Sequence, residues 1–258
     1  MPNFILTPQD MLKEERHNVI LHEVNLHNKV LTTYLGEQLG VSEDTIRRDL
    51  NELADAGKVI KVHGGALSKS FHNSFNSKDV YSLAEKKLIA QKAVKIIQDG
   101  MYIFTTGGTT ILEMARVLPE NLRATFFTGS LPAAFEYLEH PHIEVILIGD
   151  RLSKNSRITV GGGAIAQIRQ VKADLCFLGT NAIDIHAGLT DNDLDVVQIK
   201  KAMVESSSRI VSLSISEKVN TSQRLKVCNA TDIDVLITEL DPLSELLKPY
   251  RTAGMEIL

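Results

Sequence analysis

Apolar residues follow two different rhythms along this chain. Up to residue 68 they recur every three or four positions, as in helices that bury one face, and from residue 83 onward short apolar runs alternate with stretches of helical length. The runs predict strands at Met101–Thr105, Ala124–Thr128, Glu144–Gly149, Leu175–Gly179, Ile210–Ile215 and Val235–Thr238. The stretches predict helices at Ala84–Gln98, Thr110–Leu118, Pro132–Leu138, Ala164–Val171, Leu194–Ser207 and Leu243–Ala253.

The apolar runs lack clean alternation, so we expect strands that are buried on both faces of a sheet. Strands that alternate with helices predict a Rossmann-like, mostly parallel α/β domain at residues 83–258. Ser, Asn and Lys dominate the preceding stretch, and we expect a linker at residues 69–82. The remaining part, residues 1–68, is then a separate N-terminal domain.

Three helices and a hairpin are predicted in the N-terminal domain. The first helix spans Met11–Leu26 and should turn one face inward, formed by Leu12, Val19, Ile20, Val24 and Leu26. Thr32 or Thr33 is expected to cap a short second helix, Tyr34–Leu39, after which Gly40 takes the left-handed conformation of a tight turn. Ser42 is expected to cap a third helix that ends at Ala56 and Gly57.

The second and third helices have the layout of a helix-turn-helix. Ile46, Leu50 and Leu53 form one buried face of the third helix, while Thr45, Arg47 and Arg48 project from its other faces near the N-terminal end, which is the end that meets DNA in this motif. A hairpin follows, with strands at Val59–Val62 and Ala66–Leu67, and it would form a wing whose Lys61 and His63 reach the phosphate backbone. The alternative interpretation is an ordinary helical subdomain with surface arginines.

Composition narrows the classes of protein. The 258 residues carry 28 Lys and Arg against 32 Asp and Glu, and this net charge of -4 argues against a protein that coats nucleic acid without specificity. The apolar runs are too short to span a bilayer, no secretory leader is recognisable, and we expect a cytoplasmic protein. Cys176 and Cys228 are interpreted as buried thiols rather than a disulfide or metal ligands.

One turn carries candidate binding chemistry. Residues 105–110, TTGGTT, follow a predicted strand and open a helix, so glycine amides, threonine hydroxyls and the helix N-terminus suit a phosphate. A plain strand-to-helix turn is an equal alternative. At the end of the next strand Thr128 begins a second turn, in which Ser130 is expected to cap the following helix.

Other polar residues receive ordinary interpretations. The histidines lack the spacing of a metal site and are expected to be exposed, namely His17, His22, His27, His72, His140 and His142. The charged runs at residues 85–87 and 217–218 are expected to be solvated, although Lys218 follows a strand and could border a pocket. No catalytic triad, metal site or cofactor motif is recognisable in the sequence.

The N-terminal sequence VSEDTIRRDLNEL, followed by VHGGA, resembles the winged helix-turn-helix of the DeoR family of bacterial transcription regulators. This resemblance implies that Ser42, Thr45, Arg47 and Arg48 face operator DNA, with Lys61 and His63 as backbone contacts. The similarity continues through FTTGGTTILEMA, FTGSLPAA, VILIGDRL, FLGTNAIDIHAGLT, IKKAMVE and IDVLITE. It implies a sensor domain, related in fold to sugar-phosphate isomerases, that binds a phosphorylated sugar or related metabolite.

The resemblance also assigns the effector site. Thr106, Gly107, Gly108, Thr109 and Thr110 form the phosphate turn, within which Gly107 to Thr110 would cradle the phosphate. Thr128 and Ser130 would line the pocket, and Asp184 and Lys200 would hold the polar end of the ligand.

The sequence departs from the family pattern at four places. Thr106 and Asn181 stand where the family usually has Asp, Gln198 where it often has Glu, and Gly129 where it has Asn. Three of these departures remove carboxyl groups, and proton transfer between sugar carbons needs a base. We therefore expect no enzymatic activity, and a ligand that makes fewer hydroxyl contacts than the common sugar phosphates.

The sequence thus predicts a DNA-binding repressor of carbohydrate-related genes. One recognition helix covers only half of an operator, so a homodimer or homotetramer is expected, with no membrane partner. Two alternatives stay open: an isomerase-like enzyme with an extra N-terminal module, and a regulator whose sensor pocket is vestigial.

Overall fold

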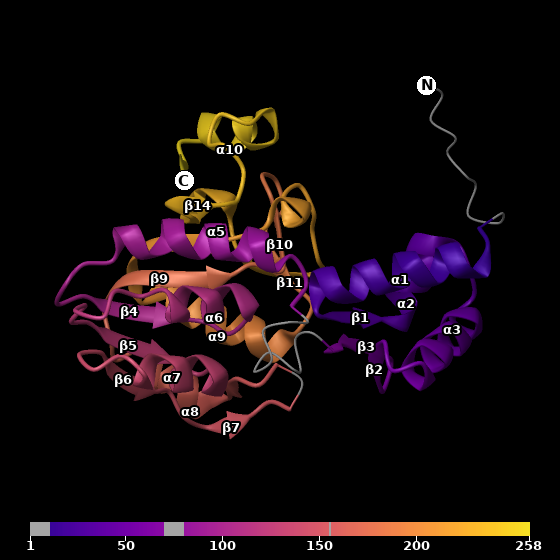
Figure 1. The fold of residues 1–258 in the computed structure, drawn as a ribbon, viewed down its shortest axis with the longest axis horizontal. Helices are drawn as coiled ribbons and strands as arrows, with labels where there is room; N and C mark the ends of the chain where they lie inside the picture. The colour runs from indigo at the N-terminus through magenta and orange to yellow at the C-terminus, as the bar shows by residue number, and fades with distance from the viewer. Residues whose placement is uncertain (1–10, 70–79, 155) are drawn as a thin grey trace. The chain divides into compact units, whose positions relative to one another are not determined.

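The computed structural model describes residues 11–69, 80–154 and 156–258. These residues form two compact units, one that ends at Tyr81 and one that begins at Ser82 (Figure 1). Most of the expected linker, residues 70–79, lies outside the described residues, as does His72. Among the described helices none is long and apolar enough to cross a lipid bilayer.

The smaller unit is a winged helix-turn-helix. Its helices are α1 (Lys13–His27), α2 (Thr32–Leu39) and α3 (Glu43–Asp55), and its strands are β1 (Lys29–Leu31), β2 (Val59–Val62) and β3 (Gly65–Ser68). The strands pair antiparallel in the order β1-β3-β2, so the predicted wing gains a third strand from the α1–α2 connection. Gly65 allows this pairing, because a Cβ atom there would lie 1.9 Å from the carbonyl oxygen of Val30.

Two predictions about these helices are wrong. Leu12 is 69 % exposed, because α1 begins only after it, whereas Ile20, Val24 and Leu26 are buried as expected. Neither Thr32 nor Thr33 caps α2, since Leu31 occupies the N-cap position and Thr32 is already the first helical residue. Gly40 at φ +63° and the Ser42 cap of α3 are confirmed.

A buried ion pair fastens α3 to α1. The Asp49 carboxylate on α3 accepts hydrogen bonds from Arg16 Nε at 2.6 Å and Arg16 Nη2 at 3.0 Å, and His17 Nε2 lies 3.0 Å away. Asp49 is only 2 % exposed. His17 is therefore engaged in a contact rather than free in solvent, and His27, expected to be exposed, is buried.

The larger unit is built on a sheet of seven described strands, all paired in parallel in the order β15-β14-β12-β9-β4-β5-β6. The strands are β4 (Tyr102–Thr105), β5 (Thr125–Thr128), β6 (Glu144–Leu147), β9 (Ala173–Gly179), β12 (Ser207–Leu213), β14 (Val235–Ile237) and β15 (Glu256–Ile257). Its helices are α5 (Leu83–Ala93), α6 (Thr109–Arg116), α7 (Leu131–Leu138), α8 (Gly162–Ile168), α9 (Leu194–Glu205) and α10 (Lys248–Thr252). Each predicted strand and helix is present with shifted boundaries, which confirms the α/β fold.

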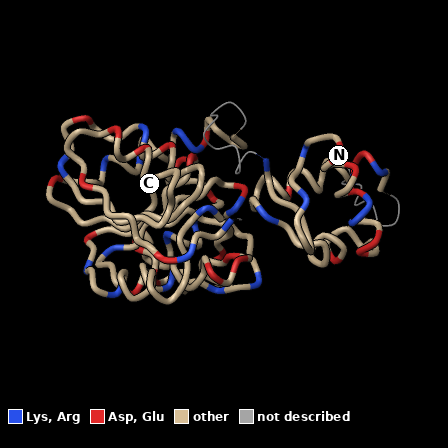
Figure 2. Tube along the Cα trace, turned by 90° about the horizontal axis from the view of Figure 1, so that it is seen from below, with Lys and Arg blue, Asp and Glu red and all other residues tan. Residues whose placement is uncertain are grey.

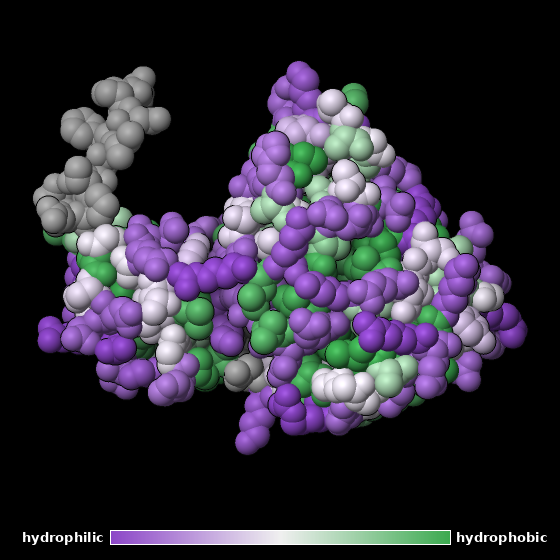
Figure 3. All heavy atoms as spheres, turned by 180° about the vertical axis from the view of Figure 1, so that it is seen from behind, coloured by the Kyte–Doolittle hydropathy of each residue, from purple (hydrophilic) through white to green (hydrophobic). Residues whose placement is uncertain are grey.

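Several short strands are not predicted by the sequence pattern. A small antiparallel sheet contains β10 (Ala182–Asp184), β11 (Gly188–Asp191) and β13 (Leu225–Cys228), and β7 (Arg151–Leu152) pairs with β8 (Thr159–Val160). The prediction of burial on both faces is wrong for β6, which lies at the edge of the large sheet and leaves Ile146 and Leu147 39 % and 46 % exposed. Figure 3 shows apolar side chains among polar ones on one face of the larger unit.

We expect Asp49→Asn to loosen the smaller unit. Hydrogen bonds to charged groups contribute roughly 1.5–3 kcal/mol each, so the protection of α1 and α3 amides should fall by about 2 kcal/mol in hydrogen exchange on the full chain. Asp44→Asn on the same helix is the matched control, because its partner Arg47 is exposed and such pairs contribute less than about 1 kcal/mol. Equal protection in both variants would contradict the role of Asp49.

The same pair sets a pH dependence. Burial by itself raises the pKa of Asp49, but the hydrogen bonds from Arg16 and His17 outweigh this effect and hold the pKa below its usual 3.8. The ionised carboxylate therefore stabilises the folded unit at pH values above 3.8, and this contribution is lost as the pH falls through the lower pKa of the folded state. Asp49→Asn should remove that part of the acid sensitivity.

Candidate functional site

The N-terminal end of α3 presents the residues expected to contact DNA. Ser42 Oγ accepts a hydrogen bond from the Thr45 amide at 3.2 Å and lies 3.0 Å from Thr45 Oγ1, so the two hydroxyls form the cap of the helix. Ile46, Leu50 and Leu53 are buried beneath, as predicted. The first turn of α3 is thus held against the unit's core while its polar side chains stay at the surface.

The two arginines of α3 differ in their contacts. Arg47 Nη2 lies 3.0 Å from Glu43 Oε2, and Arg47 Nη1 lies 2.9 Å from Asp44 Oδ1. Arg48 is exposed and forms no ion pair with the described residues. Exposed pairs of this kind are weak, so Arg47 can exchange its carboxylate partners for phosphate at small cost.

The wing lies beside the same helix. Lys61 of β2 is exposed, and its Nζ donates a hydrogen bond to Asn51 Oδ1 of α3, while His63 is exposed in the turn between β2 and β3. Figure 2 shows Lys and Arg interspersed with Asp and Glu in this unit, so its charge is mixed. The structure therefore brings Lys61 to the recognition helix, and contact of either residue with DNA stays a prediction.

A second set of predicted residues meets in the larger unit, where the carboxyl ends of β12, β9, β4 and β5 are neighbours. The turn after β4 is joined to the end of β9: Thr106 Oγ1 accepts a hydrogen bond from the Gly179 amide at 2.8 Å, and the Thr106 amide donates to the Phe177 carbonyl oxygen at 3.2 Å. Thr106 is only 3 % exposed. Its hydroxyl therefore holds the turn in place.

The glycines of this turn are required by the fold. Gly108 is the N-cap residue of α6 and has φ +119°, a conformation that side chains disfavour. A Cβ atom on Gly107 would lie 2.8 Å from Ile158 Cγ2. Thr109 and Thr110 begin α6, so the turn delivers the backbone amides of a helix N-terminus to the carboxyl edge of the sheet.

Thr128 and Ser130 use their hydroxyls within the protein. Thr128 Oγ1 donates to the Thr105 carbonyl oxygen at 3.1 Å and accepts from the Ser130 amide at 3.1 Å. Ser130 Oγ accepts from the Ala133 amide at 3.3 Å, which confirms the predicted cap of α7. Both residues lie at this edge of the sheet, but their hydroxyls already make backbone contacts.

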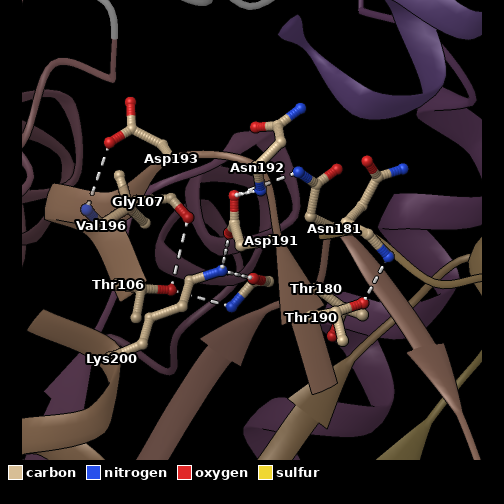
Figure 4. Close-up of polar contacts among 12 residues, drawn as sticks. Thr106, Gly107, Thr180, Asn181, Thr190, Asp191, Asn192, Asp193, Val196 and Lys200 are labelled. Atoms are coloured by element: carbon tan, nitrogen blue, oxygen red, sulfur yellow. Dashed lines mark hydrogen bonds and ion pairs between the residues drawn. The ribbon is translucent and has the colours of Figure 1, made fainter. Parts of the chain in front are cut away.

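Lys200 pairs with an aspartate that the sequence did not point out (Figure 4). Its Nζ lies 2.7 Å from Asp191 Oδ2 and 2.8 Å from the Gly179 carbonyl oxygen. Asn181 Nδ2 donates to Asp191 Oδ1 at 3.1 Å. Burial raises the pKa of Asp191, but the charge of Lys200 and these hydrogen bonds outweigh it and keep the pKa lowered, so the carboxyl group is ionised.

Asp184 lies elsewhere in the site region and has different partners. It ends β10, and its Oδ1 accepts hydrogen bonds from the His186 and Ala187 amides, each at 2.8 Å. The structure therefore gives Lys200 and Asp184 separate contacts, with Asp191 as the partner of the lysine. Whether Asp184 touches an effector stays a prediction.

Two lysines expected to be solvated are buried, and that expectation was wrong. Lys86 of α5 is 5 % exposed, and Lys218, in the short 3-10 helix Ser216–Lys218, is 7 % exposed. Lys218 Nζ donates to the Thr180 carbonyl oxygen at 2.9 Å, which is its one hydrogen bond among the described residues. In the sequence, the position of Lys218 just after a predicted strand is the one sign that it could be buried. Neighbouring Glu and Lys residues are usually exposed, so the sequence prediction favours exposure.

These lysines concentrate positive charge. Burial, together with the positive charges of Lys86 and Lys200, lowers the pKa of Lys218 from 10.5 to about 7. Burial likewise lowers the pKa of Lys86 to about 8, against the attraction of Glu113. An anion beside Lys218 would offset this repulsion. In the parts of the chain that the structure describes, no cluster of three His, Cys, Asp or Glu residues could hold a metal ion.

Lys218 makes stability depend on pH. The unfolded chain keeps this proton up to a pH near 10.5, whereas the folded chain releases it near 7, so the free energy of unfolding should rise between these values by up to about 1.4 kcal/mol per pH unit. Lys218→Met should reduce the slope, and Lys226→Met, at an exposed lysine of β13, should not. Urea unfolding of the full chain from pH 7 to 10 measures this slope of the unfolding free energy against pH. Equal slopes in the wild type and Lys218→Met would refute a buried lysine with a low pKa.

Comparison with known proteins identifies the family of both units. Residues 16–71 match the model of the DeoR-like helix-turn-helix domain, and residues 82–240 match the model of the DeoR C terminal sensor domain. The chain is 31 % identical over 250 residues to the HTH-type transcriptional regulator GolR of Listeria innocua, which covers 96 % of this chain and 98 % of that protein.

Two further relatives are similar along nearly their whole length. The HTH-type transcriptional regulator GlpR of Haloferax volcanii is 32 % identical, over 96 % of this chain and 98 % of its own. The glycerol-3-phosphate regulon repressor of Escherichia coli is 29 % identical, over 90 % of this chain and 93 % of its own. None of these matches describes an enzyme, and the chain belongs to the DeoR family of transcriptional regulators.

Proposed function

We propose that this regulator represses carbohydrate-related genes and is controlled by a phosphorylated sugar or related metabolite. Residues 1–68 bind operator DNA, residues 69–82 link the parts, and residues 83–258 bind the effector. The glycerol-3-phosphate regulon repressor among its relatives supports a phosphorylated effector. A protein that works on operators acts in the cytoplasm, where the DNA is.

One observation carries the effector proposal, namely the buried positive charge at the carboxyl edge of the sheet. Lys86, Lys200 and Lys218 are each less than 10 % exposed. Asp191 pairs with Lys200, the carboxylates of Glu113 and Glu217 attract Lys86, and the Nζ of Lys218 bonds to a backbone carbonyl oxygen. Burying ammonium groups is costly unless opposite charge lies near. A phosphate carries about two negative charges and has several acceptor oxygens, so it matches Lys218, Lys86 and the amides that begin α6.

The rest of the site favours binding over catalysis. Thr106, Thr128 and Ser130 direct their hydroxyls to backbone groups, and Asp191 is held by Lys200 and Asn181. A general base must reach a substrate proton, and an ionised carboxylate that is already bound by two side chains is poorly suited to that task. The non-phosphate end of the ligand should therefore be recognised through few hydroxyl contacts.

DNA recognition calls for more than one copy of the chain. A single α3 helix reads one half-site, and two-fold symmetric operators match two-fold symmetric proteins. We propose a homodimer or a homotetramer, with Ser42, Thr45, Arg47 and Arg48 towards the bases and phosphates and with Lys61 and His63 on the backbone.

The effector proposal can be tested by thermal shift. Phosphorylated sugars, each paired with its unphosphorylated counterpart, should raise the melting temperature only when the phosphate is present, since a ligand at 100 times its Kd stabilises the native state by about 2.7 kcal/mol. Lys218→Met should lose the shift and Lys226→Met should keep it. No phosphate-dependent shift, in protein that still binds DNA, would favour the vestigial-pocket alternative.

The DNA proposal can be tested on duplexes selected from a random library by the wild-type chain. Arg47→Ala combined with Arg48→Ala should weaken binding at least about tenfold and reduce its salt dependence, because phosphate contacts release counterions. Arg151→Ala combined with Arg169→Ala removes two similarly exposed, ion-paired arginines of the larger unit and serves as the control. Unchanged binding by the α3 variant would refute the assignment of the recognition helix.

A further inference from the structure

Tyr81 and Ser82 join the two compact units, and each is held to its own unit by a side-chain contact. The Tyr81 hydroxyl lies 3.2 Å from His22 Nδ1 on α1, and the two rings meet edge to face with centroids 6.1 Å apart. Ser82 Oγ donates a hydrogen bond to Glu217 Oε1 at 3.5 Å. The peptide between them therefore joins a residue that contacts α1 to a residue that contacts Glu217.

Ser82 has an unusual backbone conformation. Its φ of +50° and ψ of +46° are left-handed, although it precedes α5 at a position where residues are normally extended, and its side chain does not cap the helix. Its carbonyl oxygen accepts a hydrogen bond from the Lys86 amide at 3.1 Å, so Ser82 and Lys86 belong to one helical turn. A non-glycine residue in this conformation is kept there by its surroundings, and Glu217 is part of them.

Glu217 interacts both with Ser82, at the boundary of the two units, and with the buried lysines. It precedes Lys218 in the same 3-10 helix, and its carboxylate attracts the ammonium groups of both Lys86 and Lys218. A phosphate that binds these lysines would bring a second negative charge to them and repel the Glu217 carboxylate. The contact from Ser82 is long for an O–H···O hydrogen bond, so little would be needed to break it.

We propose that Glu217 and Ser82 couple effector binding to the DNA-binding unit: an anion held by Lys86 and Lys218 displaces Glu217, releases Ser82 and changes the contact of Tyr81 with His22. This inference rests on the proposed function of the site. Helix α1 carries the change further, because its Arg16 holds Asp49 of the recognition helix α3.

Hydrogen exchange on the full chain, with inorganic phosphate as the probe at pH 7, tests the coupling. In the wild type, phosphate should slow exchange around Lys218 and change exchange in α1. Tyr81→Phe should bind phosphate with a Kd within about twofold of the wild type, while α1 no longer responds. Tyr34→Phe is the matched control, because its hydroxyl also donates to α1, at 3.1 Å to Glu23 Oε2, but away from the joint, and its response should persist.

The Glu217→Gln variant provides a second test of the coupling. Without the competing carboxylate, phosphate should bind about two- to fivefold more tightly, the size of a partly exposed charge interaction, and the α1 response should disappear. A wild-type α1 response in either Glu217→Gln or Tyr81→Phe, or phosphate binding without any α1 response in the wild type, would overturn the coupling alone. Absence of protection around Lys218 in the wild type would overturn the proposed function and the coupling with it.

Discussion

Buried positive charge at the carboxyl edge of the central sheet is the constraint on which the larger unit depends. Lys200 of α9 and Lys218 after β12 bond to the carbonyl oxygens of Gly179 and Thr180, where β9 ends. The charge of Lys86, from α5, also acts on Lys218. Backbone carbonyls and Asp191 compensate the charges of Lys200 and Lys218, and Glu113 attracts Lys86. Burying three ammonium groups costs stability, and folds accept such a cost at binding sites.

In the smaller unit, the buried charge is fully paired within the protein and the remaining charges of α3 are exposed. Asp49, on the inward side of α3, is compensated by Arg16 and His17, so it fixes the helix on α1. Arg47 and Arg48, on the outward side, are exposed and free to exchange partners with the solvent or with DNA. One helix thus combines a buried pair, which positions it, with exposed surface charges, which suit a polyanionic partner.

The polar side chains of the turns after β4 and β5 are used within the protein itself. Thr106 joins β4 to β9, Thr128 joins β5 to its own turn, and Ser130 caps α7. The groups that remain for a ligand are mainly the backbone amides of these turns and the lysines around them. Recognition would then depend on charge more than on hydroxyl contacts, which agrees with the loss of family carboxylates at Thr106 and Asn181.

The sequence by itself determined the local structure. Apolar periodicity, Gly40, the Ser42 and Ser130 caps and the turn glycines act over a few residues, so the helices, the parallel strands and the helix-turn-helix could be predicted. Only the tertiary structure decided which charges are buried and which strand is an edge. Lys86 and Lys218 lie in runs that look solvated, and Asp49 and Asp191 look like ordinary surface acids, because their partners come from elsewhere in the chain. Burial of a long polar side chain depends on elements brought together by folding, and no local pattern records that.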